Sequence, residues 1–343
     1  MARMDNIVIA VDTMGSDNGS EYFIQGISEA MTEYDDLEFL VTGKEEELKR
    51  YIEQYGCDKT RITIVNATEE ITCHDAPVEA IRKKKASSMV LALNAVKEGK
   101  AQACISAGNS GALLAGGQLL IGRAKGVKRT PLAPLIPHRY GSSLLIDCGA
   151  NVDAKPENLV QFAKMGSIYM KNIEGVENPR VGIINIGAED EKGNELVKET
   201  IPLLRACTDI NFIGSVESRD IPNGAADVLV CEAFVGNVLL KFFEGLGKMF
   251  MAEIKDTLKS SPKTKIGGAL IYKPIKKTFK RYMADDKGGA PLLGLKGLVV
   301  KIHGNCKNNE VRTAIIQCRN FVKKNVTDQI IHTFEVDNQN KQA

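Results

Sequence analysis

The sequence of 343 residues lacks an excess of either charge, a long apolar run and an N-terminal signal peptide. Its 45 lysines and arginines nearly balance 43 aspartates and glutamates, so bulk charge gives no reason to expect a nucleic-acid partner. No stretch approaches the roughly 20 apolar residues of a membrane span. The first twenty residues have no basic start followed by an apolar core. These absences predict a cytoplasmic protein that does not cross a membrane.

Paired cysteine spacings are also missing. The eight cysteines are scattered, with no CxxC and no matching Cys/His spacing. We therefore expect neither a disulfide framework nor a zinc site. Cys104, Cys148 and Cys231 fall within apolar runs and are expected to be core residues.

Short apolar runs alternate along the chain with longer segments of helical periodicity. The predicted strands are 6–12, 37–42, 61–67, 103–107, 142–148, 180–186, 211–216, 227–233 and 297–303. Helical patterns between them, such as 156–170, indicate βαβ units. This order predicts an α/β protein in αβα layers, with a largely parallel sheet covered on both faces. We expect one catalytic domain over 1–335, with room for two lobes, and a disordered polar tail over 336–343.

The segment 245–288 breaks this rhythm and predicts an amphipathic helical hairpin. Its two apolar stripes are Leu246, Phe250, Ile254 and Leu258, and then Ile275, Phe279, Tyr282 and Met283. The tip joining the helices is placed at 269–272, with Leu270, Ile271 and Tyr272 between lysines. Two interpretations stay open: the hairpin packs on the sheet or on a second subunit, or its tip also enters an anionic membrane surface.

Polar, glycine-bearing junctions follow several strands, and ligands collect at the carboxyl ends of parallel strands. In ISAGNSGALLAGG, residues 105–117, the amides of Asn109, Ser110 and Gly111 and the hydroxyl of Ser106 precede a helix and suit an anion. A cation from Arg82 or Lys84 would assist them. Neither a Walker loop nor a dinucleotide fingerprint is present, so no nucleotide cofactor is expected.

Longer blocks of sequence resemble a known family. They include VDTMGSDN, RKKKASSM, SAGNSGALLA, LIDCGANVDAKPENLVQFAKMGSIY, GIINIGAEDEKGNE, ESRDIPNGAADVLVCEAFVGNVLLKFFEG and GGAPLLGLKGLVVKIHG. In this order they are similar to the bacterial phosphate acyltransferases of glycerolipid synthesis, the PlsX family. Glu232-Ala233 departs from the Asp-Gly usual there before FVGN.

The resemblance implies transfer of a long-chain acyl group from acyl carrier protein to inorganic phosphate. The acyl phosphate would pass to a membrane acyltransferase. The resemblance further implies a homodimer and a fold akin to phosphotransacetylases and the isocitrate and isopropylmalate dehydrogenases. It also implies no metal or nucleotide cofactor, and peripheral membrane association.

Combining the junctions with this chemistry gives a set of candidate residues. Asn237, Lys241 or Lys155 would face the thioester oxygen, and Lys84 would bring a cation to the reaction. His303 would protonate the departing thiol, or instead hydrogen-bond a neighbouring loop. Carboxylates repel phosphate, so the acids are expected to orient lysines or amides. The orienting or substrate-contacting set is Asp12, Asp17, Asn151, Asp153, Asp220 and Asn223.

Three other functions compete with this one. A phosphotransacylase acting on short-chain acyl-coenzyme A shares the chemistry but not the carrier. A metal- and NAD-dependent dehydrogenase of related fold should have clustered metal-binding aspartates, which are not evident. A catalytically silent membrane scaffold would not need the polar junctions.

Overall fold

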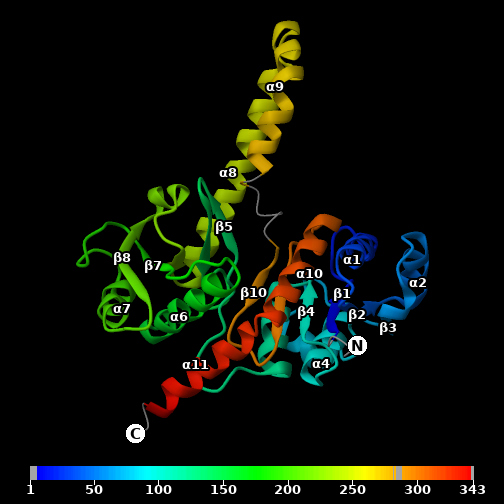
Figure 1. The fold of residues 1–343 in the computed structure, drawn as a ribbon, viewed down its shortest axis with the longest axis horizontal. Helices are drawn as coiled ribbons and strands as arrows, with labels where there is room; N and C mark the ends of the chain where they lie inside the picture. The colour runs from blue at the N-terminus through cyan, green and yellow to red at the C-terminus, as the bar shows by residue number, and fades with distance from the viewer. Residues whose placement is uncertain (1–5, 281, 283–287, 341–343) are drawn as a thin grey trace.

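The computed structural model describes residues 6–280, 282 and 288–340, and it contains two sheets side by side (Figure 1). The six-stranded sheet has the order β10-β11-β4-β1-β2-β3, and the five-stranded sheet has the order β5-β6-β9-β7-β8. All strand pairs are parallel except β10–β11 and β5–β6. The α/β class with largely parallel pairing is thus confirmed, although the strands divide between two sheets.

The strands of the six-stranded sheet are β1 (Ile7–Asp12), β2 (Leu37–Gly43), β3 (Ile62–Asn66), β4 (Ala103–Ser106), β10 (Ala290–Leu292) and β11 (Leu298–Lys301). Alternate residues of β1 serve different cores, because successive side chains of a strand point to opposite faces. Ile9 and Val11 join one buried cluster, whereas Ala10 joins another. At the carboxyl edge, Lys301, Ser106 and Asp12 occupy matching positions of β11, β4 and β1.

Helices cover both faces of this sheet. The first face is covered by α1 (Glu21–Glu33), α2 (Glu45–Gln54) and α10 (Asn308–Lys323). The second face is covered by α3 (Pro77–Lys83), α4 (Ser88–Lys97) and α5 (Ser110–Gly116), which a π-helical turn, η2 (Gly117–Ile121), extends. A short 3-10 turn, η1 (Lys59–Arg61), precedes β3.

The five-stranded sheet contains β5 (Leu135–His138), β6 (Gly141–Ile146), β7 (Arg180–Asn185), β8 (Asn211–Glu217) and β9 (Val228–Val230). On one face lie α6 (Pro156–Asn172) and α7 (Glu195–Arg205), whose buried residues belong to the same cluster as those of α1 and α10. On the other face, Leu239, Leu240 and Phe243 of α8 (Ala233–Lys259) pack over the sheet. One continuous core therefore joins the two sheets.

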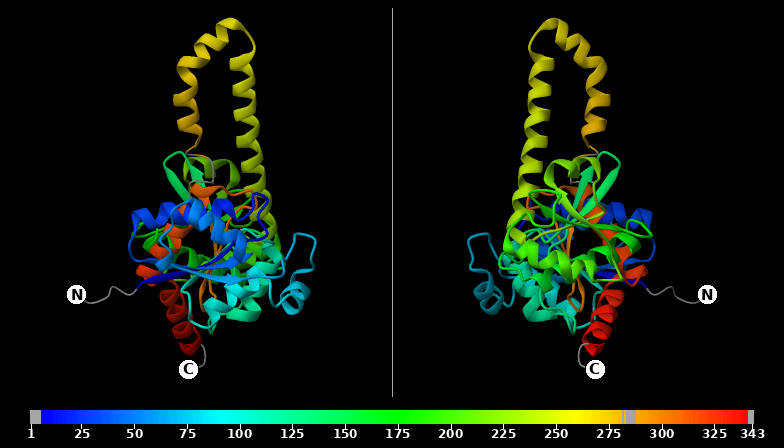
Figure 2. Two further views of the ribbon diagram at one scale, coloured as in Figure 1. Left: turned by 90° about the vertical axis from the view of Figure 1, so that its right-hand side faces the viewer. Right: turned by 90° about the vertical axis from the view of Figure 1, so that its left-hand side faces the viewer.

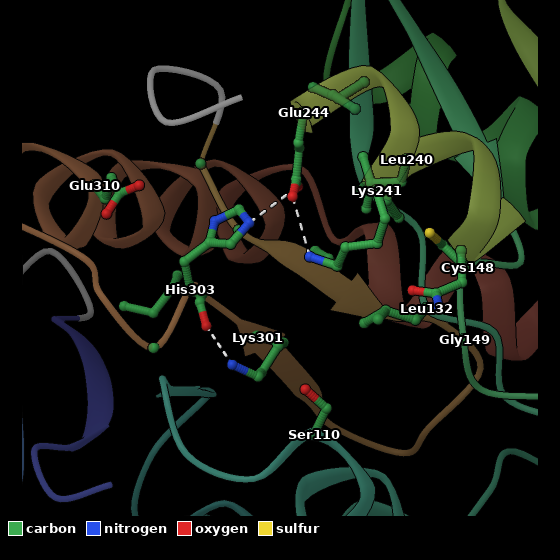
Figure 3. A pocket seen from close by; sticks show the side chains of 18 residues that line it. Ser110, Leu132, Cys148, Gly149, Leu240, Lys241, Glu244, Lys301, His303 and Glu310 are labelled. Carbon is green, nitrogen blue, oxygen red and sulfur yellow. Dashed lines mark hydrogen bonds and ion pairs between the residues drawn. The ribbon is translucent and has the colours of Figure 1, made fainter. Parts of the chain in front are cut away.

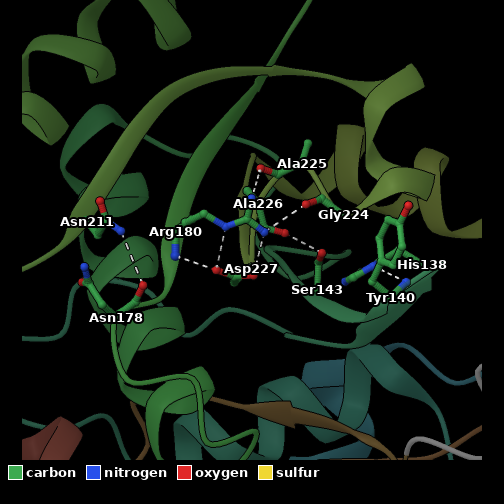
Figure 4. A network of polar contacts seen from close by, with 10 residues as sticks. All are labelled: His138, Tyr140, Ser143, Asn178, Arg180, Asn211, Gly224, Ala225, Ala226 and Asp227. Atoms are coloured by element: carbon green, nitrogen blue, oxygen red, sulfur yellow. Dashed lines mark hydrogen bonds and ion pairs between the residues drawn. The ribbon is translucent and has the colours of Figure 1, made fainter.

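The amino ends of β7 and β9 are tied together by one arginine (Figure 4). Arg180 donates two side-chain hydrogen bonds to Asp227, at 3.1 and 3.0 Å, and others to the carbonyls of Gly224 and Ala225. The 3-10 turn η3 (Ser218–Asn223) leads into this loop. The contacts fix the loop that enters β9, at the sheet edge opposite the carboxyl ends.

The hairpin projects from the body as two helices, α8 and α9 (Pro262–Lys280) (Figures 1 and 2). The prediction that 269–272 form the tip is wrong, because Leu270, Ile271 and Tyr272 lie inside α9. The helices are joined at Ser260-Ser261, where the Ser261 hydroxyl accepts from the Thr264 amide at 3.2 Å and a proline opens α9. Residues 281 and 283–287 of the predicted hairpin lie outside the described residues.

The C-terminal segment also differs from the prediction. Residues 336–340 belong to α11 (Val326–Asn340) instead of a disordered tail, and 341–343 lie outside the described residues. Phe334 is buried, and Asp337 pairs with Lys164 of α6 at 2.8 Å, which anchors the last turns. Another ion pair fixes α10: Arg319 donates to both oxygens of Asp36, at 2.7 and 2.9 Å.

Candidate active site

A cavity of about 380 Å³ lies where the carboxyl ends of strands from both sheets meet (Figure 3). The loops after β4, β6 and β11 and the first turns of α8 contribute to its wall. One part of the wall is apolar and includes Leu132, Leu135 and Leu240. The other part is polar, with two lysines, a histidine and two glutamates. The cavity thus has room for an apolar group beside charged donors.

A network of three side chains occupies the polar part of the wall. Glu244 of α8 accepts from Lys241 at 3.0 Å and from the Nε2 of His303 at 3.1 Å (Figure 3). Burial opposes ionisation of Glu244, but the hydrogen bonds from His303 and Lys241 outweigh it and lower its pKa to about 2. Glu244 is therefore an anion at neutral pH, and it orients both partners.

Lys301, the last residue of β11, supplies the second ammonium group of the cavity. Its Nζ donates to the carbonyl of Ala107 at 2.9 Å and also to that of Ile302. Burial lowers the pKa of Lys301 from 10.5 to about 8, against the opposing influence of Cys306 and Asp12. At neutral pH the group is still mostly protonated, in a site that water solvates poorly.

The turn between β4 and α5 is held by a buried acid. Ser106 donates its hydroxyl proton to Asp12 at 2.6 Å and accepts from the Gly108 amide at 3.1 Å. Burial raises the pKa of Asp12 to about 6, although hydrogen bonds from Ser106 and others oppose the shift. Asn109 caps α5 by accepting from the Ala112 amide at 3.1 Å. These bonds fix the turn that brings Ser110 to the cavity.

A second buried acid shapes the loop after β6. Asp147 accepts from the amides of Leu132 and Asn151, at 2.9 and 2.7 Å. The Asn151 side chain also donates to Asp147, at 2.7 Å, and is itself buried. Cys148 follows in the cavity wall, where burial raises its thiol pKa to about 12. A thiol with that pKa stays protonated near neutral pH and is a poor nucleophile.

Comparison with known proteins agrees with the resemblance described above. The family described as "Fatty acid synthesis protein" matches residues 7–329. A phosphate acyltransferase of Clostridium novyi is 47% identical over 323 residues, covering 94% of this chain and 97% of that protein. The chain belongs to the phosphate acyltransferase family. Another relative of that name, from Clostridium botulinum strain Loch Maree, is 46% identical and covers 94% of this chain and 96% of its own.

Two solved structures share the fold at low identity. A phosphotransacetylase from Streptococcus pyogenes has a TM-score of 0.61 at 18% identity, covering 92% of this chain and 94% of its own. A branched-chain phosphotransacylase from Enterococcus faecalis has a TM-score of 0.58 at 15% identity, covering 92% and 99%. The fold of this acyltransferase is thus that of the phosphotransacylases.

Four of the predicted site residues line the cavity: Ser110, Asn237, Lys241 and His303. They come from three junctions that the sequence placed at strand ends. The loop after β1, which contains Asp17, lies beside them, because the Asp17 amide donates to the carbonyl of the lining residue Gly304 at 2.8 Å. The departure at Glu232 also has an explanation: its carboxylate caps α8 by accepting from two backbone amides.

Other predicted residues do not line the cavity. Lys84 pairs with Asp75 at 2.7 Å and donates to the Glu70 carbonyl, and Arg82 is exposed nearby on α3. Asn151 is committed to Asp147. Exposed positions outside the cavity are occupied by Asp153, Lys155, Asp220 and Asn223. The turn before Ser110 is stabilised by hydrogen bonds of Ser106, Asn109 and Asp12. Gly111 packs on Pro77.

Lys301 and Glu244 also line the cavity, but they were not among the residues predicted from the sequence. Lys301 ends an apolar strand, GLVVK, where a lysine at the carboxyl end is the only signal. Glu244 is one of many charged residues in segments with a helical pattern.

The described residues hold no group of three or more side chains suited to a metal ion. They also include no helix with the length and apolar character needed to cross a membrane.

Proposed function

We propose that the protein transfers a long-chain acyl group from acyl carrier protein to inorganic phosphate, giving acyl phosphate for phospholipid synthesis. The observation that carries the proposal is the cavity itself, in which an apolar wall faces two ammonium groups and a histidine. The apolar wall suits the acyl end of a thioester. The cations suit phosphate and the oxyanion that forms when phosphate attacks.

In the proposed reaction a phosphate oxygen attacks the thioester carbonyl carbon, and a carbon–oxygen bond forms. Lys241, beside Asn237, stabilises the resulting tetrahedral oxyanion. Its collapse breaks the carbon–sulfur bond, and the imidazolium form of His303 gives its Nδ1 proton to the departing sulfur while Nε2–H stays on Glu244. The proton carried by the attacking monohydrogen phosphate then returns to the imidazole. A thiol with a pKa near 8.5 is a fair leaving group, so positioning accounts for most of the rate. The protonated state of Cys148 favours direct transfer over an acyl-cysteine intermediate.

The donor is tested by comparing palmitoyl-acyl carrier protein with butyryl-coenzyme A. We expect thiol release from the carrier protein only when phosphate is present, with acyl phosphate trapped by hydroxylamine. Faster turnover of butyryl-coenzyme A would favour a short-chain phosphotransacylase, the activity class suggested by the structural neighbours. Absence of phosphate-dependent release from either donor would contradict both functions.

We further propose that α8 mediates a homodimer. Phe234, Val238, Phe242 and Met249 recur on one side of the helix, and each is at least half exposed; Phe242 is 67% exposed. A second copy of the same surface would bury them. Sedimentation should show a dimer, and Phe242→Asp should shift it towards monomer. A dimer unchanged by this substitution would place the interface elsewhere.

We also propose peripheral contact of the hairpin with anionic membrane. Ile266, Leu270 and Ile271 of α9 are exposed, and lysines flank them. Leu270→Asp with Ile271→Asp should abolish flotation with phosphatidylglycerol vesicles while turnover of soluble donor continues. Undiminished flotation of this variant would rule out these side chains as the anchor.

A further inference from the structure

Lys301 differs from the other lysine of the cavity in how its charge is compensated. Lys241 is 59% exposed and is paired with the Glu244 carboxylate. Lys301 is part-buried, and its hydrogen bonds go to two neutral carbonyls, those of Ala107 and Ile302. Among the described residues no carboxylate forms an ion pair with it. Lys301 therefore adds a positive charge to the cavity wall without an anion in direct contact.

The geometry of the ammonium group indicates a ligand on the cavity side. A lysine ammonium has three protons to donate, and the Ala107 and Ile302 carbonyls take two. Both carbonyls belong to strand ends, so they fix the position of Nζ at the sheet edge. Lys301 and Ser110 both line the cavity, at the end of β11 and at the start of α5. The third ammonium proton has no acceptor among the described residues, so it is left for a ligand in the cavity.

The acids near Lys301 do not occupy this position. The Asp12 carboxylate is buried and accepts from Ser106 and the Met14 amide. Glu310, the other acid of the wall besides Glu244, accepts from the Lys307 amide and lies beyond His303 in Figure 3. The Asp17 carboxylate lies against Gly304 and acts on Lys301 through its charge alone. None of these carboxylates hydrogen-bonds the Lys301 ammonium among the described residues.

We propose that Lys301 is the residue that binds the inorganic phosphate substrate, with the Ser110 hydroxyl as a second donor. This inference rests on the proposed function. It assigns the phosphate to the part of the cavity wall at the carboxyl ends of β4 and β11. The His303 ring extends from the loop after β11 towards Glu244 of α8, away from the Lys301 ammonium (Figure 3). A phosphate at Lys301 thus leaves that side for the thioester sulfur. The charge of Lys301 is held in place by the strand ends before phosphate arrives, which reduces the ordering cost of binding.

The test is calorimetric titration of inorganic phosphate, without an acyl donor, into wild type, Lys301→Met and a matched control, Lys296→Met. Lys296 is exposed in the turn before β11 and lies outside the cavity. Loss of a charge-assisted hydrogen bond should raise the phosphate Kd about 10- to 100-fold in Lys301→Met. Lys296→Met should bind as wild type does.

The outcomes separate this inference from the proposed function. Wild-type affinity in a folded Lys301→Met protein would overturn the inference and leave the function standing. No phosphate binding by wild type would overturn both. Steady-state kinetics give a second readout: in Lys301→Met the KM for phosphate should rise while the KM for the acyl donor stays the same. A rise confined to the donor KM would assign Lys301 to the donor instead.

Discussion

The burial of Lys301 predicts a measurable effect on folding that is independent of catalysis. Its pKa is lowered from 10.5 to about 8 by burial, so the unfolded chain binds a proton more tightly than the folded one. Between these values the folded lysine is neutral while the unfolded lysine is charged. The free energy of unfolding therefore rises with pH in this range. The burial penalty of Lys301 is fully present below pH 8 and is relieved above it.

The size of the effect follows from the shift. Each pH unit above 8 contributes about 1.4 kcal/mol, so wild type should gain about 2 kcal/mol relative to Lys301→Met between pH 7 and pH 9.5. The measurement is urea unfolding of both proteins at several pH values. Comparing them cancels the titration of all other groups. Lys301→Arg stays charged throughout, so its difference from Lys301→Met should not vary with pH.

A difference between wild type and Lys301→Met that is constant from pH 7 to pH 9.5 would refute the reasoning. It would mean that the lysine has an ordinary pKa in the folded protein, and hence that it is solvated. A change of opposite sign would mean that an anion holds the ammonium in its charged form.

Three further predictions concern other parts of the site and the fold. Asn109→Ala removes the cap of α5, so it should destabilise the protein by about 1 kcal/mol and raise the KM for phosphate. Urea unfolding measures the first effect and steady-state kinetics the second. If neither value changed, the capping role would be contradicted. Cys148→Ala should retain most of its turnover and wild-type Cys148 should react slowly with iodoacetamide at pH 7, whereas total loss of turnover in a folded variant would indicate an acyl-cysteine. Asp36→Asn should lower the free energy of unfolding at pH 7 by about 2 kcal/mol, because hydrogen bonds from Arg319 outweigh burial and lower the pKa of Asp36 to about 2. Relative to the variant, wild type should lose this stability as pH falls from 4 to 2. A difference in unfolding free energy that persists at pH 2 would contradict this role of Asp36.

Local patterns in the sequence predicted the helices and strands better than their assembly. The strand at 6–12 is evident because every residue from Ile7 to Val11 is apolar. Its neighbours in the sheet depend on long-range pairing with Leu37 and Ala103, which periodicity does not encode. The same limit explains why one sheet was expected where two are present. Short edge strands such as β5 and β10 carry too few residues to form a pattern.

The site was predictable where a strand-to-helix junction carries the residue, as at Ser110 and Asn237. It was not predictable where a side chain becomes special only through burial. The sequence does not distinguish Lys301 from other lysines, because its properties come from the Ala107 carbonyl and the cavity around it. The sequence did contain the signal for the end of α8, since Ser261 followed by a proline is a common helix start. The prediction instead placed the tip at the apolar residues 269–272, which lie inside α9.

The helix α8 has a mechanical consequence. It runs without interruption for 27 residues, or about 40 Å at 1.5 Å per residue. Its first three turns hold Asn237, Lys241 and Glu244 against the cavity, while its far end lies in the projecting hairpin. No loop separates the two ends, so a force applied to the hairpin would be transmitted along the helix to these residues. Tilting the distal end by a few degrees would shift Lys241 and Glu244 together, and with them the partner of His303.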